Sequence, residues 1–125
     1  MMDKFEDIAA TVKSIPDDEE RLEYILELGS RLPGIPGVKT GVEIKGCSSR
    51  LEILKEGGEY YAASDSRMVG GLAYLFLSLA SGKTDKEIEA TDFMGEVSKL
   101  GLPIGYNRVT GLKALEKFLK TGGSA

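Results

Sequence analysis

The sequence predicts an α+β domain in which helices gather on a three-stranded antiparallel sheet. Two segments with helical periodicity precede a block of alternating apolar and polar residues, and three more helical segments follow it. Because helices and strands are segregated along the chain, the predicted order is α-α-β-β-β-α-α-α with an antiparallel sheet. A chain of 125 residues with 42% hydrophobic residues can bury one core. We therefore expect a single domain of residues 1–120, followed by a flexible C-terminal tail of residues 121–125.

Two helices are predicted before the strands. Residues 3–14 place apolar side chains at helical spacing, and Ile15–Pro16 ends this segment because the residue before proline avoids the α-helical region. Asp17 is a side-chain cap for a second helix, with Glu20 three residues later in a capping-box pattern. Gly29 is the expected C-terminal stop of this second helix.

Three short strands are expected next, because β-type alternation and turn residues replace the helical pattern. The connection between the first two strands contains Cys47, and Gly57–Gly58 forms the turn between the second and the third. The strands are expected around residues 42–44, 51–54 and 60–62.

Three helices are predicted in the remaining chain. Ser66 is expected to cap a central helix that is apolar almost all round. Thr84 and Glu87 form a capping-box pattern before another short helix that ends near Gly101. Asn107 is expected to cap the last helix.

Composition excludes several classes of function. A net charge of −4 and a pI of about 4.9 argue against nucleic acid as a partner, because phosphate binding needs an excess of Lys and Arg. The sequence has no histidine and one cysteine, which excludes a Ser-His-Asp triad, a Cys-His pair and a Cys/His zinc site. No metal or nucleotide motif is present, so no bound metal or cofactor is expected.

Location is also constrained by the sequence. The longest apolar stretch, around residues 72–80, is far shorter than the roughly 20 residues that cross a bilayer. No secretory signal pattern is found at the start, and a single cysteine cannot form an internal disulfide. A cytoplasmic protein without membrane contact is expected.

Cys47 is the main candidate for chemistry. A free cysteine often serves as a small buried apolar residue, so an inert Cys47 is one interpretation. Its neighbours Gly46, Ser48 and Ser49 instead form a small polar loop, which is unusual around a packing cysteine. These neighbours favour a reactive, accessible thiol.

The missing residue types indicate which reaction a reactive Cys47 would support. Acyl transfer or hydrolysis needs an adjacent base, whereas attack on an activated sulfur of a partner needs mainly access and some thiolate. Lys45 and Arg50 flank the loop and could favour the thiolate, although alternation along a strand prevents both from being assumed to approach the sulfur. Without a resolving cysteine, any group on Cys47 must pass to another molecule. A carrier site is therefore favoured.

Four segments, in order, resemble the SufE family. Tyr24–Pro33 (YILELGSRLP) is similar to the family's second-helix signature, and Gly46–Ser49 (GCSS) resembles its G-C-x-S acceptor loop. Ser64–Leu72 resembles the S-D-x-x-x-V-x-G-L entry to the central helix, and Asn107–Leu112 resembles the S-R-x-x-G-L segment. Their common order is more specific than any one of them.

The resemblance implies a SufE/NifU-like fold and a sulfur acceptor. Cys47 would take persulfide sulfur from a cysteine desulfurase, which carries the pyridoxal phosphate, and pass it to an iron–sulfur cluster assembly scaffold. The chain would then activate its partner enzyme rather than act as a stand-alone enzyme, as a monomer or weak homodimer. A scaffold role is disfavoured, because one thiol cannot hold a cluster.

The resemblance also implies supporting roles for two charged residues. Asp65 occupies the family's aspartate position, although helix capping is an alternative explanation. Arg108 occupies the family's arginine position, where it could stabilise a sulfur anion or contact the desulfurase; the alternative is a solvated surface group. The sequence departs from the family at Glu52, where a tryptophan is usual, and in residues 103–108.

Two other functions remain open at this stage. A regulatory module could dock on a desulfurase or an assembly factor without accepting sulfur, and Glu52 and the altered segment 103–108 favour that alternative. A thiol redox sensor would show rapid oxidation of Cys47 by peroxide. The absence of a second thiol and of histidine makes the sensor the weaker of the two.

Overall fold

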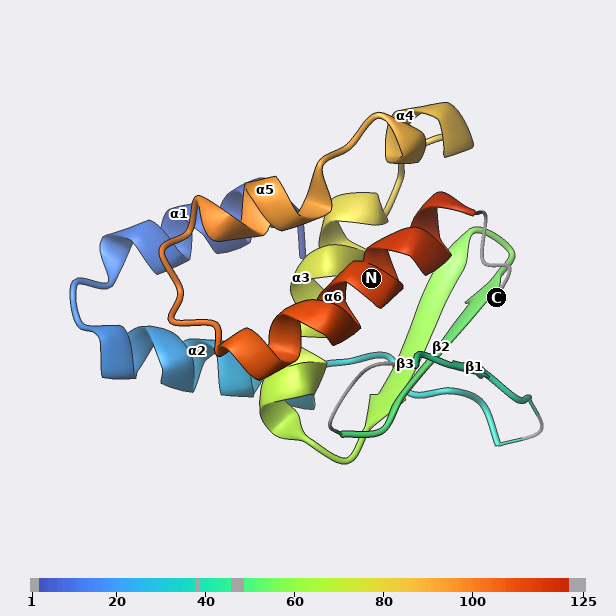
Figure 1. The fold of residues 1–125 in the computed structure, drawn as a ribbon, viewed down its shortest axis with the longest axis horizontal. Coiled ribbons are helices and arrows are strands. Elements are labelled where there is room, and N and C mark those ends of the chain that lie inside the picture. The colour runs from blue at the N-terminus through green and yellow to red at the C-terminus, as the bar shows by residue number, and fades with distance from the viewer. Residues whose placement is uncertain (1–2, 38, 46–48, 122–125) are drawn as a thin grey trace.

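The computed structural model describes residues 3–37, 39–45 and 49–121, with the side chains of residues 106 and 107 excepted. The predicted α+β class and element order are confirmed (Figure 1). The elements are α1 (Phe5–Ser14), α2 (Asp18–Ser30), β1 (Val42–Glu43), β2 (Leu51–Glu56), β3 (Glu59–Ser64), α3 (Arg67–Ala80), α4 (Asp85–Glu89), α5 (Phe93–Ser98) and α6 (Tyr106–Lys120).

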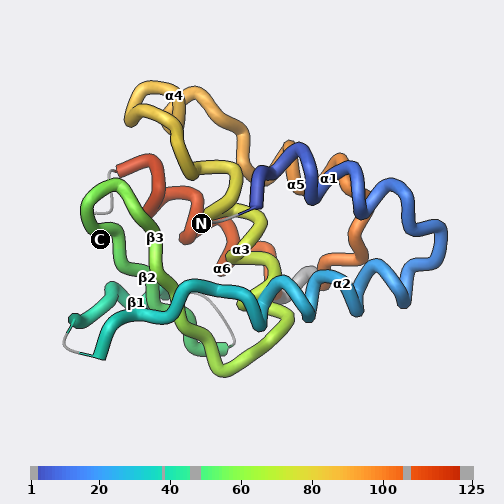
Figure 2. Tube along the Cα trace, turned by 180° about the vertical axis from the view of Figure 1, so that it is seen from behind, coloured from blue at the N-terminus to red at the C-terminus, as the bar shows by residue number. Residues whose placement is uncertain are grey.

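The three strands form one antiparallel sheet in the order β1-β2-β3, with the helices at one side of it (Figures 1 and 2). Helix α3 is central, and α1, α2, α5 and α6 all contact it. The hairpin of β2 and β3 turns at Gly57–Gly58, where both glycines have positive φ, as the glycine pair predicts. Strand β1 lies at the open edge of the sheet.

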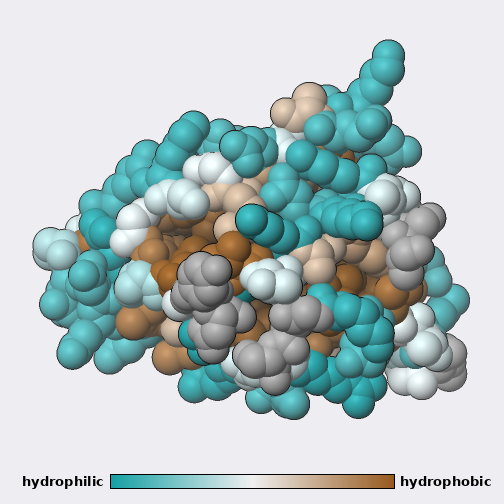
Figure 3. Space-filling view, in the orientation of Figure 1, coloured by the Kyte–Doolittle hydropathy of each residue, from teal (hydrophilic) through white to brown (hydrophobic). Residues whose placement is uncertain are grey.

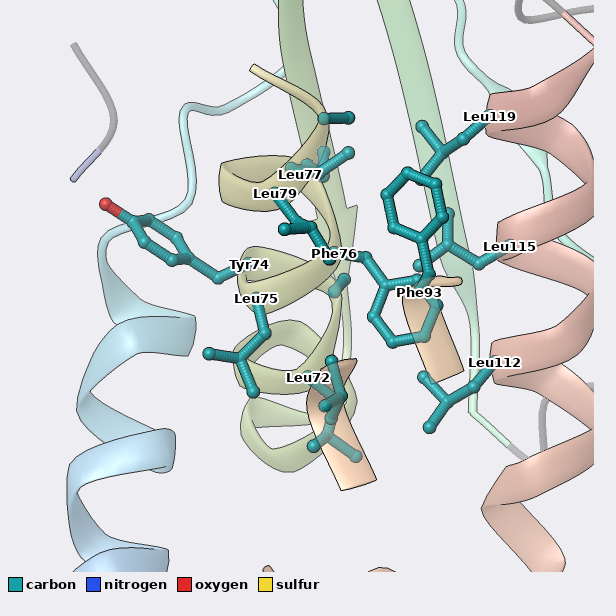
Figure 4. Packing of buried hydrophobic residues seen from close by; sticks show 14 of the residues in the cluster. Leu72, Tyr74, Leu75, Phe76, Leu77, Leu79, Phe93, Leu112, Leu115 and Leu119 are labelled. Atoms are coloured by element: carbon teal, nitrogen blue, oxygen red, sulfur yellow. The ribbon is translucent and has the colours of Figure 1, made fainter. Parts of the chain in front are cut away.

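The core lies between α3, α6 and the inner face of the sheet. Phe76 of α3 stacks on Phe93 of α5 with ring centroids 5.7 Å apart (Figure 4). Leu115 of α6 and Ile53 of β2 are fully buried in the same cluster. Such burial contributes about 1.5–3 kcal/mol per large side chain, which fixes α6 against α3 and the sheet.

Local capping signals set most helix starts as predicted. The Asp17 carboxylate accepts the N–H of Glu20 at 3.1 Å, and the Ser66 hydroxyl accepts the N–H of Val69 at 3.2 Å. Thr84 and Glu87 form both bonds of a capping box at the start of α4. The sequence between two elements therefore determines where each of these helices begins.

Gly29 is not the C-terminal stop of α2 that its sequence pattern predicts, because the helix continues to Ser30. A Cβ at Gly29 would lie 2.9 Å from the backbone nitrogen of Gly71 on α3, and a Cβ at Gly71 would clash with the carbonyl of Ile25. The two glycines allow the α2 and α3 backbones to approach closely. The role of Gly29 is thus helix packing rather than termination.

Two other expectations differ in detail. The segment predicted as one short helix from Thr84 to Gly101 is divided into α4 and α5, because the Asp92 carboxylate caps a new helix by accepting the N–H of Gly95 at 3.0 Å. The predicted cap Asn107 lies inside α6, whose N-cap is Gly105 in an extended conformation. Glycine is tolerated at an N-cap position, so the helix can begin earlier than the asparagine suggests.

The tail predicted at residues 121–125 lies outside the described residues from residue 122 onward. Thr121 is the C-cap of α6. Within the described part of the chain, no helix has both the length and the apolar character needed to span a membrane.

Candidate functional site

The candidate site is the connection between β1 and β2. The N–H of Ile44 donates to the carbonyl of Leu51 at 2.8 Å, which closes the base of this connection just beyond the paired residues of the two strands. Ile44 and Leu51 are both buried, so the base is held by packing as well. Cys47, Gly46 and Ser48 lie outside the described residues; Ser49 is half-buried beside them.

Arg50, the first residue after Ser49, is fixed through both of its backbone groups. Its N–H donates to the Asp65 carboxylate at 3.1 Å, and its carbonyl accepts the hydroxyl of Ser64 at 2.7 Å. The same hydroxyl accepts the N–H of Ser66 at 3.1 Å, which links this contact to the start of α3. The C-terminal side of the loop is therefore anchored to the β3–α3 junction.

This geometry corrects the capping interpretation of Asp65. Ser66 caps α3, whereas Asp65 binds the backbone of Arg50, 15 residues earlier in the chain. The sequence marked the Ser64–Ser66 segment, but a helix-capping pattern carries no information about a partner on another element. Ser64 was not singled out as a site residue, although it stands in the same family motif.

Charged side chains on both sides of the loop are paired with glutamates. Lys45 lies 3.7 Å from the Glu43 carboxylate, and the Arg50 guanidinium is hydrogen-bonded to Glu52. Glu43 and Glu52 are directly opposite each other in the β1–β2 register. The hydrogen bond and the negative charge of Glu52 raise the pKa of Arg50, so this guanidinium stays protonated.

These pairs bear on the expectation that Lys45 and Arg50 favour a thiolate at Cys47. The four side chains together carry no net charge, and Lys45 and Arg50 are largely exposed, at 85% and 66%. Exposed, paired charges act weakly on a neighbouring group because solvent and the partner carboxylate both screen them. Glu52, where the family usually has tryptophan, thus engages one of the two cations beside the loop.

Arg108 lies in the first turn of α6 and lines a pocket of about 120 Å³ with apolar residues of α2, α3 and the segment before α6. Its Nε atom is buried, and among the described residues it has no hydrogen-bond partner. Arg108 is therefore partly buried rather than fully exposed, and its supporting role stays a prediction. Within the same residues, no hydrogen bond or ion pair joins Arg108 to Asp65 or Arg50, so the three are not one polar network.

The described residues contain no cluster of three or more potential metal ligands among His, Cys, Asp and Glu. The geometry around the loop thus offers backbone anchors and two ion pairs. Such a frame can present a short segment to a partner and hold its two ends in place.

The family model of the Fe-S metabolism associated domain, SufE, matches residues 6–122 of the chain. A SufE-like protein of Rhizobium meliloti, itself uncharacterised, is 30% identical over 115 residues, covering 82% of this chain and 82% of the relative. The sulfur acceptor protein CsdE of Escherichia coli is also 30% identical, over 108 residues, with 79% of this chain and 74% of CsdE covered.

Among solved structures, a hypothetical protein from Thermus thermophilus, studied in solution, has a similar fold. The two chains superpose with a TM-score of 0.70, and the match covers 97% of this chain and 94% of the other. At 20% identity this likeness bears on the fold alone.

Proposed function

This chain belongs to the SufE family, whose domain is associated with iron–sulfur metabolism, and we propose that it is a sulfur acceptor that works through Cys47. The donor is the persulfide of a cysteine desulfurase. The observation that carries this proposal is the family match over residues 6–122, which includes the acceptor-type loop at residues 46–49. The similarity to the sulfur acceptor CsdE supports the same role.

The transfer step needs no cofactor in this chain. The Cys47 thiolate attacks the terminal sulfur of the donor persulfide and forms a new S–S bond, while the donor's S–S bond breaks and its cysteine leaves as a thiolate. Cys47 then carries the persulfide, and no electrons are gained or lost overall. Because the donor sulfur is already activated, the lack of a histidine base is compatible with this reaction.

The sulfur then has to leave the chain. With one thiol in the sequence, Cys47 cannot release sulfur by forming an internal disulfide. A second partner, an iron–sulfur assembly scaffold, is the proposed recipient. The chain is thus a carrier between two proteins and an activator of the desulfurase, because removal of the product sulfur frees the donor cysteine.

Two described residues support the step in this proposal. Asp65 holds the backbone of Arg50 and so limits the positions that the end of the loop can reach. Arg108 carries a positive charge in the first turn of α6 and has a buried Nε, and in this proposal it favours an anionic persulfide or a partner carboxylate.

Intact-mass analysis tests the proposal. The chain is incubated with a cysteine desulfurase, pyridoxal phosphate and cysteine, and its mass is read before and after thiol reductant. We expect a reductant-sensitive gain of about one sulfur mass, as a persulfide requires, and none in Cys47→Ser.

A mass that stays unchanged with every desulfurase of the same organism would contradict the acceptor role. If such a chain, or Cys47→Ser, still altered desulfurase turnover, the regulatory alternative would replace it. The Arg50–Glu52 pair at the usual tryptophan position is the feature that favours this second candidate.

A further inference from the structure

A groove of about 440 Å³ lies between β1 and the C-terminal half of α6. Residues 42–45 form one wall, and Ala114, Lys117 and Phe118 contribute to the other. Its volume falls within the range of about 300–1,000 Å³ that is typical of ligand-binding clefts. Figure 3 shows that brown, apolar surface is exposed between teal, hydrophilic side chains on this face of the molecule.

The set of lining residues locates the groove along the edge of the sheet. Val42 and Glu43 of β1, whose side chains point to opposite faces of the sheet, line the groove together with the next two residues, so it runs along the backbone of this segment. β1 is an outer strand in the order β1-β2-β3. The N–H of Ile44 points to β2, where it binds Leu51, so the N–H and carbonyl of Glu43 point away from β2.

The groove combines this edge, which pairs with no other strand among the described residues, with an apolar wall and a positive rim. Ala114 and Phe118 present apolar surface, while Lys45 and Lys117 carry positive charge against the single negative charge of Glu43. The balance of these side chains is positive, whereas the whole chain has a net charge of −4. An extended peptide with an apolar side chain beside an acidic one fits these three properties.

The position of the groove indicates which protein supplies the peptide. Lys45 is two residues before Cys47, and two residues span at most about 7 Å. A protein whose cysteine reaches Cys47 therefore has to approach this end of the groove. We propose that an extended apolar and acidic segment of the donor desulfurase docks here by adding a strand to β1, an inference that rests on the proposed function.

Calorimetric binding of the desulfurase tests this docking, with every variant in a Cys47→Ser background so that no sulfur moves. Glu43→Pro removes the outward N–H, and proline is tolerated where an edge strand faces outward. We expect it to weaken binding about tenfold, as the loss of a key backbone hydrogen bond and of access to the edge would. Glu43→Gln keeps the N–H and removes a repulsive charge, so it should bind at least as tightly as Glu43.

A second pair of variants leaves the strand untouched. Lys117→Glu reverses the charge at the rim and should weaken binding several-fold, whereas Lys113→Glu, on the same helix but outside the groove, should have less than about a twofold effect. Cooperative unfolding of each variant confirms that it is folded.

The outcomes separate the two hypotheses. Equal affinities for Lys117→Glu and Lys113→Glu, or equal losses in Glu43→Pro and Glu43→Gln, would overturn the docking groove. Sulfur gain on the unmodified chain is a separate measurement. If the groove variants bind normally while Cys47 accepts sulfur, the proposed function stands without this docking groove. If the groove variants bind weakly while Cys47 gains no sulfur, the acceptor role is removed but the desulfurase-binding groove remains.

Discussion

The α2–α3 interface and the base of the β1–β2 connection are held by different forces, although both are built from the family-type motifs. At the interface, Gly29 and Gly71 let two helix backbones meet, and buried apolar side chains fill the space around them. At the loop, Asp65 and Ser64 bind one residue, Arg50, through hydrogen bonds that water can also reach. Motif glycines thus stabilise the frame, and motif polar residues position the loop.

The largest effect is expected at the interface. In Gly71→Ala, the added methyl would clash with the carbonyl of Ile25, so the helices must move apart. We expect a loss of about 3 kcal/mol in the free energy of unfolding, measured with urea. Gly34→Ala is the matched control, since a Cβ there meets no atom within 4 Å. A Gly71→Ala protein as stable as Gly34→Ala would mean that the close helix approach is not needed.

The helical region also contains a polar contact between α6 and α5, which tests whether apolar packing alone stabilises this region. The Glu116 carboxylate, 14% exposed, accepts the N–H groups of Phe93 and Met94 at 3.2 and 3.3 Å and pairs with Lys120. Glu116→Ala leaves these donors unpaired and should cost about 2 kcal/mol in the same urea experiment. Glu96 forms an exposed ion pair with Lys99, so Glu96→Ala should change the free energy of unfolding by less than about 0.5 kcal/mol.

The loop anchor should give a smaller and more local effect. Asp65→Ala removes the acceptor of the Arg50 N–H and should lower stability by about 1 kcal/mol. Hydrogen exchange at the Arg50 amide should become several-fold faster, while amides of α3 keep their protection. Slow exchange at Arg50 in the variant would show that Ser64 alone holds the strand end; Asp18→Ala serves as a control away from the loop.

The smallest effect is expected from a hydrogen-bonded carboxylate far from both regions. Hydrogen bonds from the backbone and the hydroxyl of Thr84 lower the pKa of Glu87. A lowered pKa means that the ionised form stabilises the fold above about pH 4.3, the unfolded value, and that this contribution disappears as the pH falls through the folded pKa. Urea midpoints of the native chain and Glu87→Gln should therefore differ above about pH 4.3 and converge as the pH falls below it. A difference between the two urea midpoints that does not change with pH would show that the ionised Glu87 carboxylate does not stabilise the capping box.

The parts of the fold that depend on local sequence could be predicted from the sequence. Asp17, Ser66 and Thr84 cap helices because their side chains accept N–H groups three residues later in the chain. This spacing is visible in the sequence itself. The turn at Gly57–Gly58 is equally local. Element order and the antiparallel sheet followed from these signals and from periodicity.

What the sequence left unspecified depends on contacts between distant elements. Gly29 has the pattern of a helix stop, and only the approach of α3 shows why the helix continues past it. Asp65 has the pattern of a cap, yet its partner lies 15 residues earlier. Glu52 was visible as a departure from the family, but its pairing with Arg50 depends on side-chain placement that sequence spacing does not specify. Cys47 remains a prediction from motif and composition.

The two hydrogen bonds to the backbone of Arg50 affect how a partner could bind the end of this strand. Two exposed hydrogen bonds, each contributing about 1 kcal/mol, leave the released strand end populated in about 3% of molecules at any moment. A protein that binds only the released form would therefore lose about 30-fold in apparent affinity relative to one that accepts the anchored form. The released form is therefore available to an abundant partner, while most molecules keep the anchored form.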